Sequence, residues 1–300
     1  MDYTEAREAF FAPREGEAAA LTWTTPARRL RDAVEPLAGI VYWSEPAYDA
    51  LAAQGLDFLS GYVWGRASVL GEPDAGVVAA AFGVFEPSLV AGAYDAGRRA
   101  CTLTEVRAAR VAGVSEALRT VLGEPTDDVA TVARTLRSAA LTGDGTGRAL
   151  FSGLAGLEEP EDPWAQLWLA CSLLREHRGD SHLAALVAAG VDGIQANLLT
   201  ERWIGWEPQA YAGSRGWSPE QMAAADSTLQ RHGLVDGPAL TEAGLALREQ
   251  VEAATDAAQQ PVLEALADDL DALLDQLGRW ADRVVEHGWF PPDPYKRAAG

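Results

Sequence analysis

Lysine and cysteine are scarce in this 300-residue sequence, which contains one lysine, Lys296, and two cysteines. Cys101 and Cys171 stand far apart between apolar neighbours, so neither a disulfide framework nor a cysteine-based metal site is expected. Basic residues are few overall: 24 lysines and arginines stand against 44 aspartates and glutamates, and the formal net charge is −20. Such a charge repels phosphate backbones, which makes DNA an unfavourable partner.

Membrane segments and export signals are also missing from the sequence. No run of about 18 uncharged apolar residues occurs, so no transmembrane helix is predicted. The first twenty residues are acidic and lack the basic start and apolar core of a signal peptide. We therefore expect a cytoplasmic protein with no membrane partner. Its 48% apolar and 8% aromatic residues are typical of a folded globular chain.

Two stretches of the sequence resemble one another. Residues 48–63 match residues 183–198 at a constant offset of 135. The glycine that ends a helix, the aspartate two residues after it and a later proline all keep this offset. A helix-turn-helix unit that occurs twice is the interpretation we favour, and a chance match between alanine-rich helices is the alternative.

Hydrophobic spacing and capping signals predict a mainly α fold of tandem, duplicated winged-helix-like units, with minor β-wing hairpins and a long C-terminal helix. A charged, proline-containing segment at 157–163 indicates a linker. The expected divisions are an N-terminal lead at 1–26, a first winged-helix-like unit at 27–157, a second winged-helix unit at 164–257, and a C-terminal helix and tail at 258–300.

The second unit has the order of elements of a winged helix. A capped helix over 218–232 ends at Gly233, a short turn follows, and Thr241 begins a long helix. This order is similar to the recognition helix, wing and following helix of MarR-type DNA-binding proteins. The similarity implies a winged-helix fold for residues 180–256.

The charges on this segment argue against DNA recognition. Recognition helices are expected to aim basic and polar side chains at bases and phosphates. Here the helix carries Glu220 and Asp226 against Arg231, and the wing at 236–239 has no cation. We expect that DNA recognition has been lost, with a basic patch assembled from distant arginines as the alternative.

An apolar stripe with alternating steps of three and four residues runs over 263–284. Such a stripe packs inside a molecule or forms a dimer seam. We favour packing onto the core, so the protein is expected to be a monomer or a homodimer formed through this helix.

The densest group of polar residues lies at 177–182, where we predict a corner between two helices. At such a corner Asp180 and His182 can converge on a small ligand, while Arg178 offers a cationic fork for a carboxylate. The structural alternative is that Asp180 caps a helix and Arg178 pairs with a neighbouring carboxylate. The spacing of His177, Asp180 and His182 does not match the short metal motifs, so no metal and no cofactor are expected.

The offset of 135 also places residues 42–45 opposite this corner. If the two units pack about a pseudo-twofold axis, both sets of side chains face one cleft, and domain interfaces favour ligand pockets. An acidic shell with aromatic pockets suits a planar, neutral or cationic organic compound. The predicted ligand-binding residues are Tyr42, Trp43, Glu45, Tyr62, Trp64, Arg66, His177, Arg178, Asp180, His182 and Asn197.

Catalytic motifs do not stand out in the sequence. No nucleophile elbow, kinase signature, nucleotide fingerprint or metalloprotease motif occurs. An enzyme would have to use Asp180, His182 or Glu45 as acid–base groups.

Several segments together resemble a known family. VYWSEPAYDALAAQGL, WGRASVLGEP, EHRGDSHLAALVAAGVDG and the later GWSPEQ and LTEAG are similar to an actinobacterial family of proteins of comparable length, which have a MarR-like winged-helix region and no settled activity. Its members carry a Tyr-Phe-Ser-Pro-Glu motif and a Trp-Arg-Gly-Asp-x-His motif. This chain departs from them at Trp43, at the order of residues 44–46, and at His177. The resemblance draws attention to Arg178, Asp180 and His182.

These observations favour a small-molecule-binding protein on a winged-helix scaffold that has lost DNA recognition, with the ligand between the two units. The alternatives are a MarR-like DNA-binding transcriptional regulator and an acid–base enzyme of natural-product biosynthesis.

Overall fold

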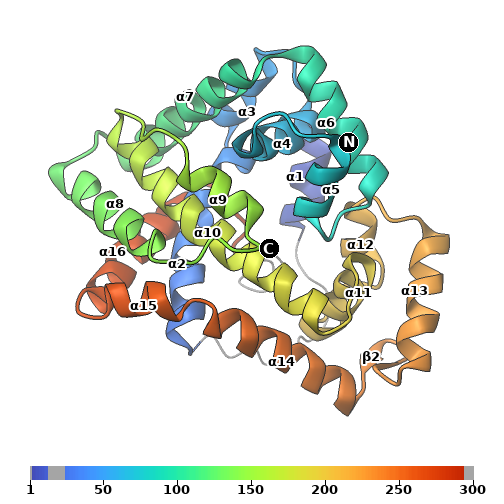
Figure 1. Ribbon diagram of the computed structural model, residues 1–300. Coiled ribbons are helices and arrows are strands. Elements are labelled where there is room, and N and C mark those ends of the chain that lie inside the picture. Colours follow the sequence, from blue (N-terminus) through green and yellow to red (C-terminus); the bar gives the residue numbers. More distant parts are fainter. Residues whose placement is uncertain (1, 13–23, 294–300) are drawn as a thin grey trace.

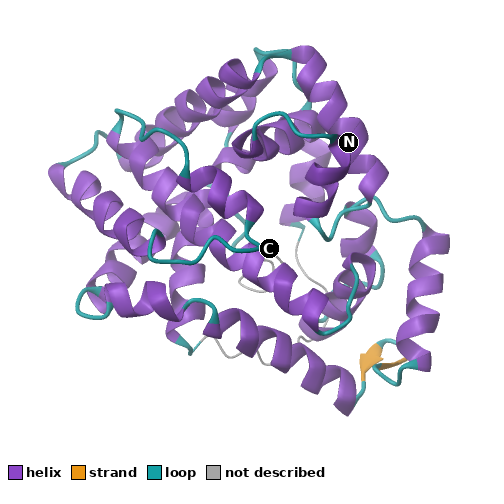
Figure 2. Ribbon diagram, in the orientation of Figure 1, coloured by secondary structure: helices purple, strands orange, loops and turns teal. Residues whose placement is uncertain are grey.

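A computed structural model of the protein describes residues 2–12 and 24–293 (Figure 1). The described chain is mainly helical, as predicted, and its sheet is a single two-stranded hairpin (Figure 2). Residues 13–23 of the predicted lead and residues 294–300 of the predicted tail lie outside the described part. In chain order the elements are α1 (Tyr3–Phe11), α2 (Pro26–Trp43), α3 (Glu45–Ala52), α4 (Phe58–Ala67), η1 (Ser68–Leu70), α5 (Ala75–Phe82), α6 (Pro87–Ala100), α7 (Leu103–Leu122), α8 (Asp127–Ala140), α9 (Ala149–Ala155), α10 (Pro163–Ala188), α11 (Gly193–Ile204), α12 (Ala210–Ser214), α13 (Pro219–Arg231), β1 (Val235–Asp236), β2 (Ala239–Leu240), α14 (Glu242–Ala257), α15 (Gln260–Leu266) and α16 (Leu270–Glu286).

Capping residues recognisable in the sequence begin several of these helices. Asp57 at α4 and Asp192 at α11 each accept the backbone N–H of the residue three positions on, whose side chain bonds back to the cap. Ser218 does the same at α13, where Pro219 occupies the first turn. These bonds satisfy N–H groups that a helix otherwise leaves unpaired, so they fix where each helix starts.

Helices α2 and α10 form the centre of the molecule (Figure 1). Helix α10 packs against α2, α7, α8, α9 and α14, and α2 packs also against α16. Leu37, Leu167 and Leu277, one from each of α2, α10 and α16, are fully buried in one core cluster. The apolar stripe at 263–284 therefore packs inside the chain, which is the intramolecular alternative of the two considered.

The predicted corner at 177–182 is wrong, because α10 runs unbroken through it from Pro163 to Ala188. A glycine such as Gly179 costs a helix about 1 kcal/mol, whereas burial of a single leucine contributes about 1.5–3 kcal/mol. Leu174 and Leu186 on either side of it are both buried. Packing of the helix on both sides of the glycine outweighs the local cost.

The segment predicted to be a winged helix forms α11, α12, α13, the β1–β2 hairpin and α14 (Figure 2). The hairpin is antiparallel and pairs Val235 with Leu240. Gly244 lets α14 approach the hairpin, since a Cβ there would lie 2.0 Å from the carbonyl oxygen of Leu234. A separate hydrophobic cluster that includes Leu198 holds these elements together.

The first half of the chain contains a similar series of helices, α3 to α7. Helices α4 and α11 begin at residues 58 and 193, and α5 and α12 at 75 and 210, which is the offset found in the sequence. Helix α4 packs against α6 as α11 packs against α13, and α3 packs against α7 as α10 packs against α14. The predicted wing of this first series is absent, because residues 101–102 alone connect α6 to α7.

Within the described residues, no single helix combines the length and apolar character needed to cross a membrane. Helices α10 and α11 meet that test only when taken together, and they are bent by 104°.

Candidate ligand-binding site

A cavity of about 120 Å³ lies between the two halves of the chain. Helices α2 and α4 and the link between α5 and α6 contribute from the first half. Helices α10, α11 and α14 contribute from the second half, together with Tyr211 and Arg215. Both predicted units therefore line it, and small-molecule sites are commonly found in such places.

One wall of the cavity is aromatic. Tyr62 on α4, Phe82 at the end of α5 and Phe85 after it lie against one another with ring centroids 5.7–6.1 Å apart. Leu30 and Val34 of α2 add aliphatic surface. The ring planes are inclined by 40–81° to one another, so the wall presents both ring faces and ring edges. Aromatic ligands pack well against either, in stacked or edge-to-face arrangements.

Two arginines of the lining are held by buried carboxylates. Arg66 donates two hydrogen bonds to Glu176, at 3.0 and 2.8 Å, and Arg175 bonds both Glu176 and Glu35 at 2.9 Å. Burial alone would raise the pKa of Glu176, but the neighbouring guanidinium groups outweigh it and lower the pKa to about 2. On this side of the cavity the carboxylates of Glu176 and Glu35 balance the charges of the two arginines, and the ion pairs hold these side chains in position.

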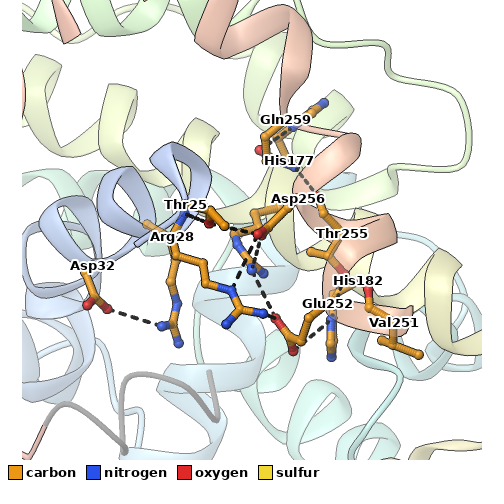
Figure 3. Close-up of polar contacts among 12 residues, drawn as sticks. Thr25, Arg28, Asp32, His177, His182, Val251, Glu252, Thr255, Asp256 and Gln259 are labelled. Atoms are coloured by element: carbon orange, nitrogen blue, oxygen red, sulfur yellow. Dashed lines mark hydrogen bonds and ion pairs between the residues drawn. The ribbon is translucent and has the colours of Figure 1, made fainter. Parts of the chain in front are cut away.

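A second polar cluster joins α10 to α14 (Figure 3). Glu252 accepts hydrogen bonds from Arg178 at 3.3 Å and from Arg248 at 2.8 Å, and Arg28 lies 3.5 Å away. Asp256 accepts from Arg178 at 3.0 Å. Burial would raise the pKa of Glu252, but Arg248 and the other surrounding cations lower it to about 2. Glu252 therefore stays ionised at neutral pH and forms ion pairs with several cations at once.

His182 lies beside this cluster as a neutral base. Burial lowers its pKa to about 3. The hydroxyl of Thr255 donates to the carbonyl of Val251 at 2.7 Å, so it accepts at 3.0 Å from Nδ1 of His182. That bond assigns the proton to Nδ1 and leaves Nε2 as a hydrogen-bond acceptor.

Arg248 and Arg215 line the same cavity, and each has hydrogen-bond donors that bond no described residue. Arg248 is 2% exposed and stacks over the ring of Trp203 at 4.4 Å. Its Nη2 donates to Glu252, while Nε and Nη1 have no partner. Arg215 lies over the rings of Phe85 and Tyr211, donates to the Tyr211 hydroxyl at 3.1 Å, and leaves its buried Nε without a partner.

Several residues predicted from the sequence come together at this cavity. They lie on three different helices, α4, α10 and α11. Asn197 among them donates to the carbonyl of Val84 at 2.8 Å and so connects the two halves. The predicted residues that line the cavity are Tyr62, Arg66, Arg178, His182 and Asn197.

The other predicted residues from the first half lie elsewhere. Tyr42 is partly buried and lines a separate small pocket with Arg175 and Glu176. Trp43 stacks on Phe10, and Trp64 is fully buried in the core of the first helix series. Glu45 is exposed and pairs with Arg7 at 3.3 Å.

His177 and Asp180 also point away from the cavity, because α10 continues without a corner. Nδ1 of His177 lies 3.0 Å from Oε1 of Gln259. Asp180 accepts the backbone N–H of Phe151 at 3.0 Å, and burial raises its pKa to about 6. Both side chains hold neighbouring helices in place.

The cavity also contains residues that sequence reasoning missed. They come from widely separated segments of the chain, so no local motif joins them. One signal was available: Arg248 and Glu252 are spaced i, i+4 on a face of α14 that also carries apolar residues. The missed residues with polar or aromatic side chains include Arg31, Glu35, Phe82, Phe85, Arg215 and Arg248.

The surface that a DNA-binding winged helix would use is poor in cations. The predicted recognition helix is α13, whose exposed Arg231 bonds Thr228 at 2.9 Å. Arg202 of α11 is held between Asp226 and the carbonyl of Gly237 in the hairpin. The basic groups near this face are therefore few and already engaged.

A model of a helix-turn-helix family matches residues 27–291 of this chain. Comparison with curated proteins and with solved structures gave no match. The match covers both series of helices, the cavity between them and the winged-helix segment.

Proposed function

Because this chain belongs to a helix-turn-helix family, we propose that it is a small-molecule receptor in which the winged helix forms part of the binding site instead of reading DNA. The ligand is a planar aromatic compound held between the two series of helices. The observation that carries this proposal is the cavity of about 120 Å³ with three aromatic rings on one wall. Cavities of about 150 Å³ hold a benzene molecule, so a single ring is the expected size of the buried part.

Filling the cavity should abolish ligand binding. Ala196 is buried on α11 and lines the cavity. We expect Ala196→Leu to weaken binding of single-ring probes (benzyl alcohol, benzamide, benzylamine and benzoate) by about tenfold or more, because added methylene groups occupy the space of the ring. Titration by ligand-observed NMR measures this change. Ala246→Leu, at an exposed position of the neighbouring α14, is the matched control. Equal binding by both variants, or no binding of any probe to the unmodified protein, contradicts the proposal.

We also propose that the two series of helices descend from one duplicated unit. The helix starts that keep the offset of 135 support this origin. Superposition of α3–α7 on the end of α10 through α14 in an experimental structure tests it, and helix axes that diverge after α4 and α11 would rule it out.

A DNA-binding regulator is the second candidate, since the family and the complete winged helix favour it. We expect a gel shift at physiological salt with the promoter of its own gene to give only non-specific affinity, with a Kd of about 10⁻⁴ to 10⁻⁶ M. The reason is the shortage of cations on α13 and the hairpin. A complex that forms in the nanomolar range and resists competitor DNA would establish the regulator instead.

A further inference from the structure

We propose that the ligand of this cavity is an organic anion, a carboxylate or a phosphate ester, whose charged group pairs with Arg248 while Arg215 supplies a second cation. The inference rests on the proposed receptor function and adds the chemical class of the ligand. It differs from the neutral or cationic compound expected from composition.

The donors of Arg248 are the strongest reason. Its guanidinium group is almost completely buried, yet two of its nitrogen atoms, Nε and Nη1, have no hydrogen-bond partner among residues 2–12 and 24–293. A buried donor without a partner is costly, and more so when it carries charge. An oxygen of a ligand anion would satisfy these donors in the two-pronged geometry that arginine and carboxylate or phosphate groups share.

The carboxylate beside Arg248 is already shared. Glu252 accepts from Arg178 as well as from Arg248. Its single negative charge therefore cannot be assigned to Arg248 alone. Arg248 therefore keeps unsatisfied donors at a position where it is only 2% exposed, and electrostatic attraction is strong at such a buried position.

Arg215 adds a second cation, which pairs with no carboxylate of the described residues. Its contacts in the described chain are the rings of Phe85 and Tyr211 and the Tyr211 hydroxyl. An aromatic face attracts a cation without neutralising its charge. The arginine stays available to an anion at the edge of the aromatic wall.

The charge of the groups that line the cavity is thus opposite in sign to the net charge of the whole chain. Six arginines and one glutamate line it, although the net charge of the protein is −20. Glu176, Glu252 and Asp256 do not line the cavity, but they pair with Arg66, Arg175, Arg178 and Arg248 of its lining. The positive character inside the cavity therefore comes from the donors of Arg248 and Arg215 that these carboxylates leave unpaired. A surface that repels anions around a cavity that binds them favours an anion with a substantial apolar body over a small inorganic ion.

Matched pairs of single-ring probes test the inference. Benzoate and phenyl phosphate carry the anion, and benzamide has nearly the same shape without charge. We expect benzoate or phenyl phosphate to bind at least tenfold more tightly than benzamide in NMR titrations. Arg248→Met should lower the affinity for the anion by about ten- to hundredfold and change the affinity for benzamide by less than twofold. Arg231→Met, on the exposed face of α13, is the control that should leave all three unchanged.

The order of the two anions identifies the headgroup, since tighter phenyl phosphate indicates a phosphate ester and tighter benzoate a carboxylate. If Arg248→Met does not fold, Arg215→Met provides the same comparison. If benzamide binds as tightly as either anion, the proposal of an anionic ligand is refuted, but the proposed receptor function is not. Failure of all probes, including benzyl alcohol and benzylamine, refutes the receptor and the anion together.

Discussion

Replacement of Glu252 by alanine is expected to lower the free energy of unfolding by about 3–5 kcal/mol, the largest loss that we predict for a single substitution. Glu252 is 5% exposed and lies within 4.0 Å of Arg28, Arg178, Arg248 and His182. Without it, buried guanidinium groups lose the carboxylate that compensates for their removal from water. Removing one partner of a buried charge cluster costs more than the cluster contributes, because the other charges remain buried.

Urea unfolding followed by circular dichroism measures this loss. Glu249→Ala is the matched control, since Glu249 lies on the same helix but is exposed, and it should change stability by less than about 0.5 kcal/mol. Glu252→Gln should fall between the two, because the amide keeps an acceptor but not the charge. A loss below about 1 kcal/mol for Glu252→Ala would show that the arginines do not depend on this carboxylate.

The second large effect is a loss of stability in acid. Unfolded histidine takes up a proton below about pH 6.5, whereas His182 in the folded protein resists it until about pH 3. The unfolded state therefore binds more protons in this interval, and stability falls as pH is lowered. Glu176 and Glu252 act in the same direction below their ordinary pKa of 4.5, since both remain ionised down to about pH 2. Asp180, with a folded pKa raised to about 6, opposes them by binding its proton more tightly in the folded state.

Burial also raises the pKa of Glu201, which acts in the same direction as Asp180. The lowered pKa values of His182, Glu176 and Glu252 outweigh these two, so we expect the free energy of unfolding to fall by several kcal/mol between pH 7 and pH 3. Urea unfolding at a series of pH values measures it. His182 keeps 24% of its side-chain exposure, so water screens part of its contribution, which we place at about 2 kcal/mol by pH 4.5. His182→Gln isolates this part, because the variant should lose less stability between pH 6.5 and 4.5. An unchanged slope in the variant would show that His182 is not held neutral.

Local signals in the sequence predict the helices and the hairpin of residues 193–257 well. The caps at Asp192, Ser218 and Thr241 and the glycine after α13 each act within one turn of the chain, so sequence spacing reveals them. The same kind of reasoning fails at 177–182. There, turn-forming residues suggest a corner, but packing on both sides of Gly179 keeps α10 continuous. Tertiary packing overrides local preference most readily in a long buried helix.

The cavity could be predicted only in part. The duplicated offset brought Tyr62, Arg66 and Asn197 into consideration, and all three line it. Its ion pairs could not be predicted, because Arg66 and Glu176 are 110 residues apart and Arg175 and Glu35 are 140 apart. The anionic ligand that we propose differs from the neutral or cationic one expected from composition for a similar reason. An average charge of the whole chain says little about which side chains are brought together in one interior space.

A crystal structure of the protein grown with benzoate tests the central claim most directly. The account predicts density for one ring against Tyr62 and Phe85, with the carboxylate within hydrogen-bond distance of Arg248. A cavity filled by side chains, or benzoate bound only on the outer surface, would contradict it.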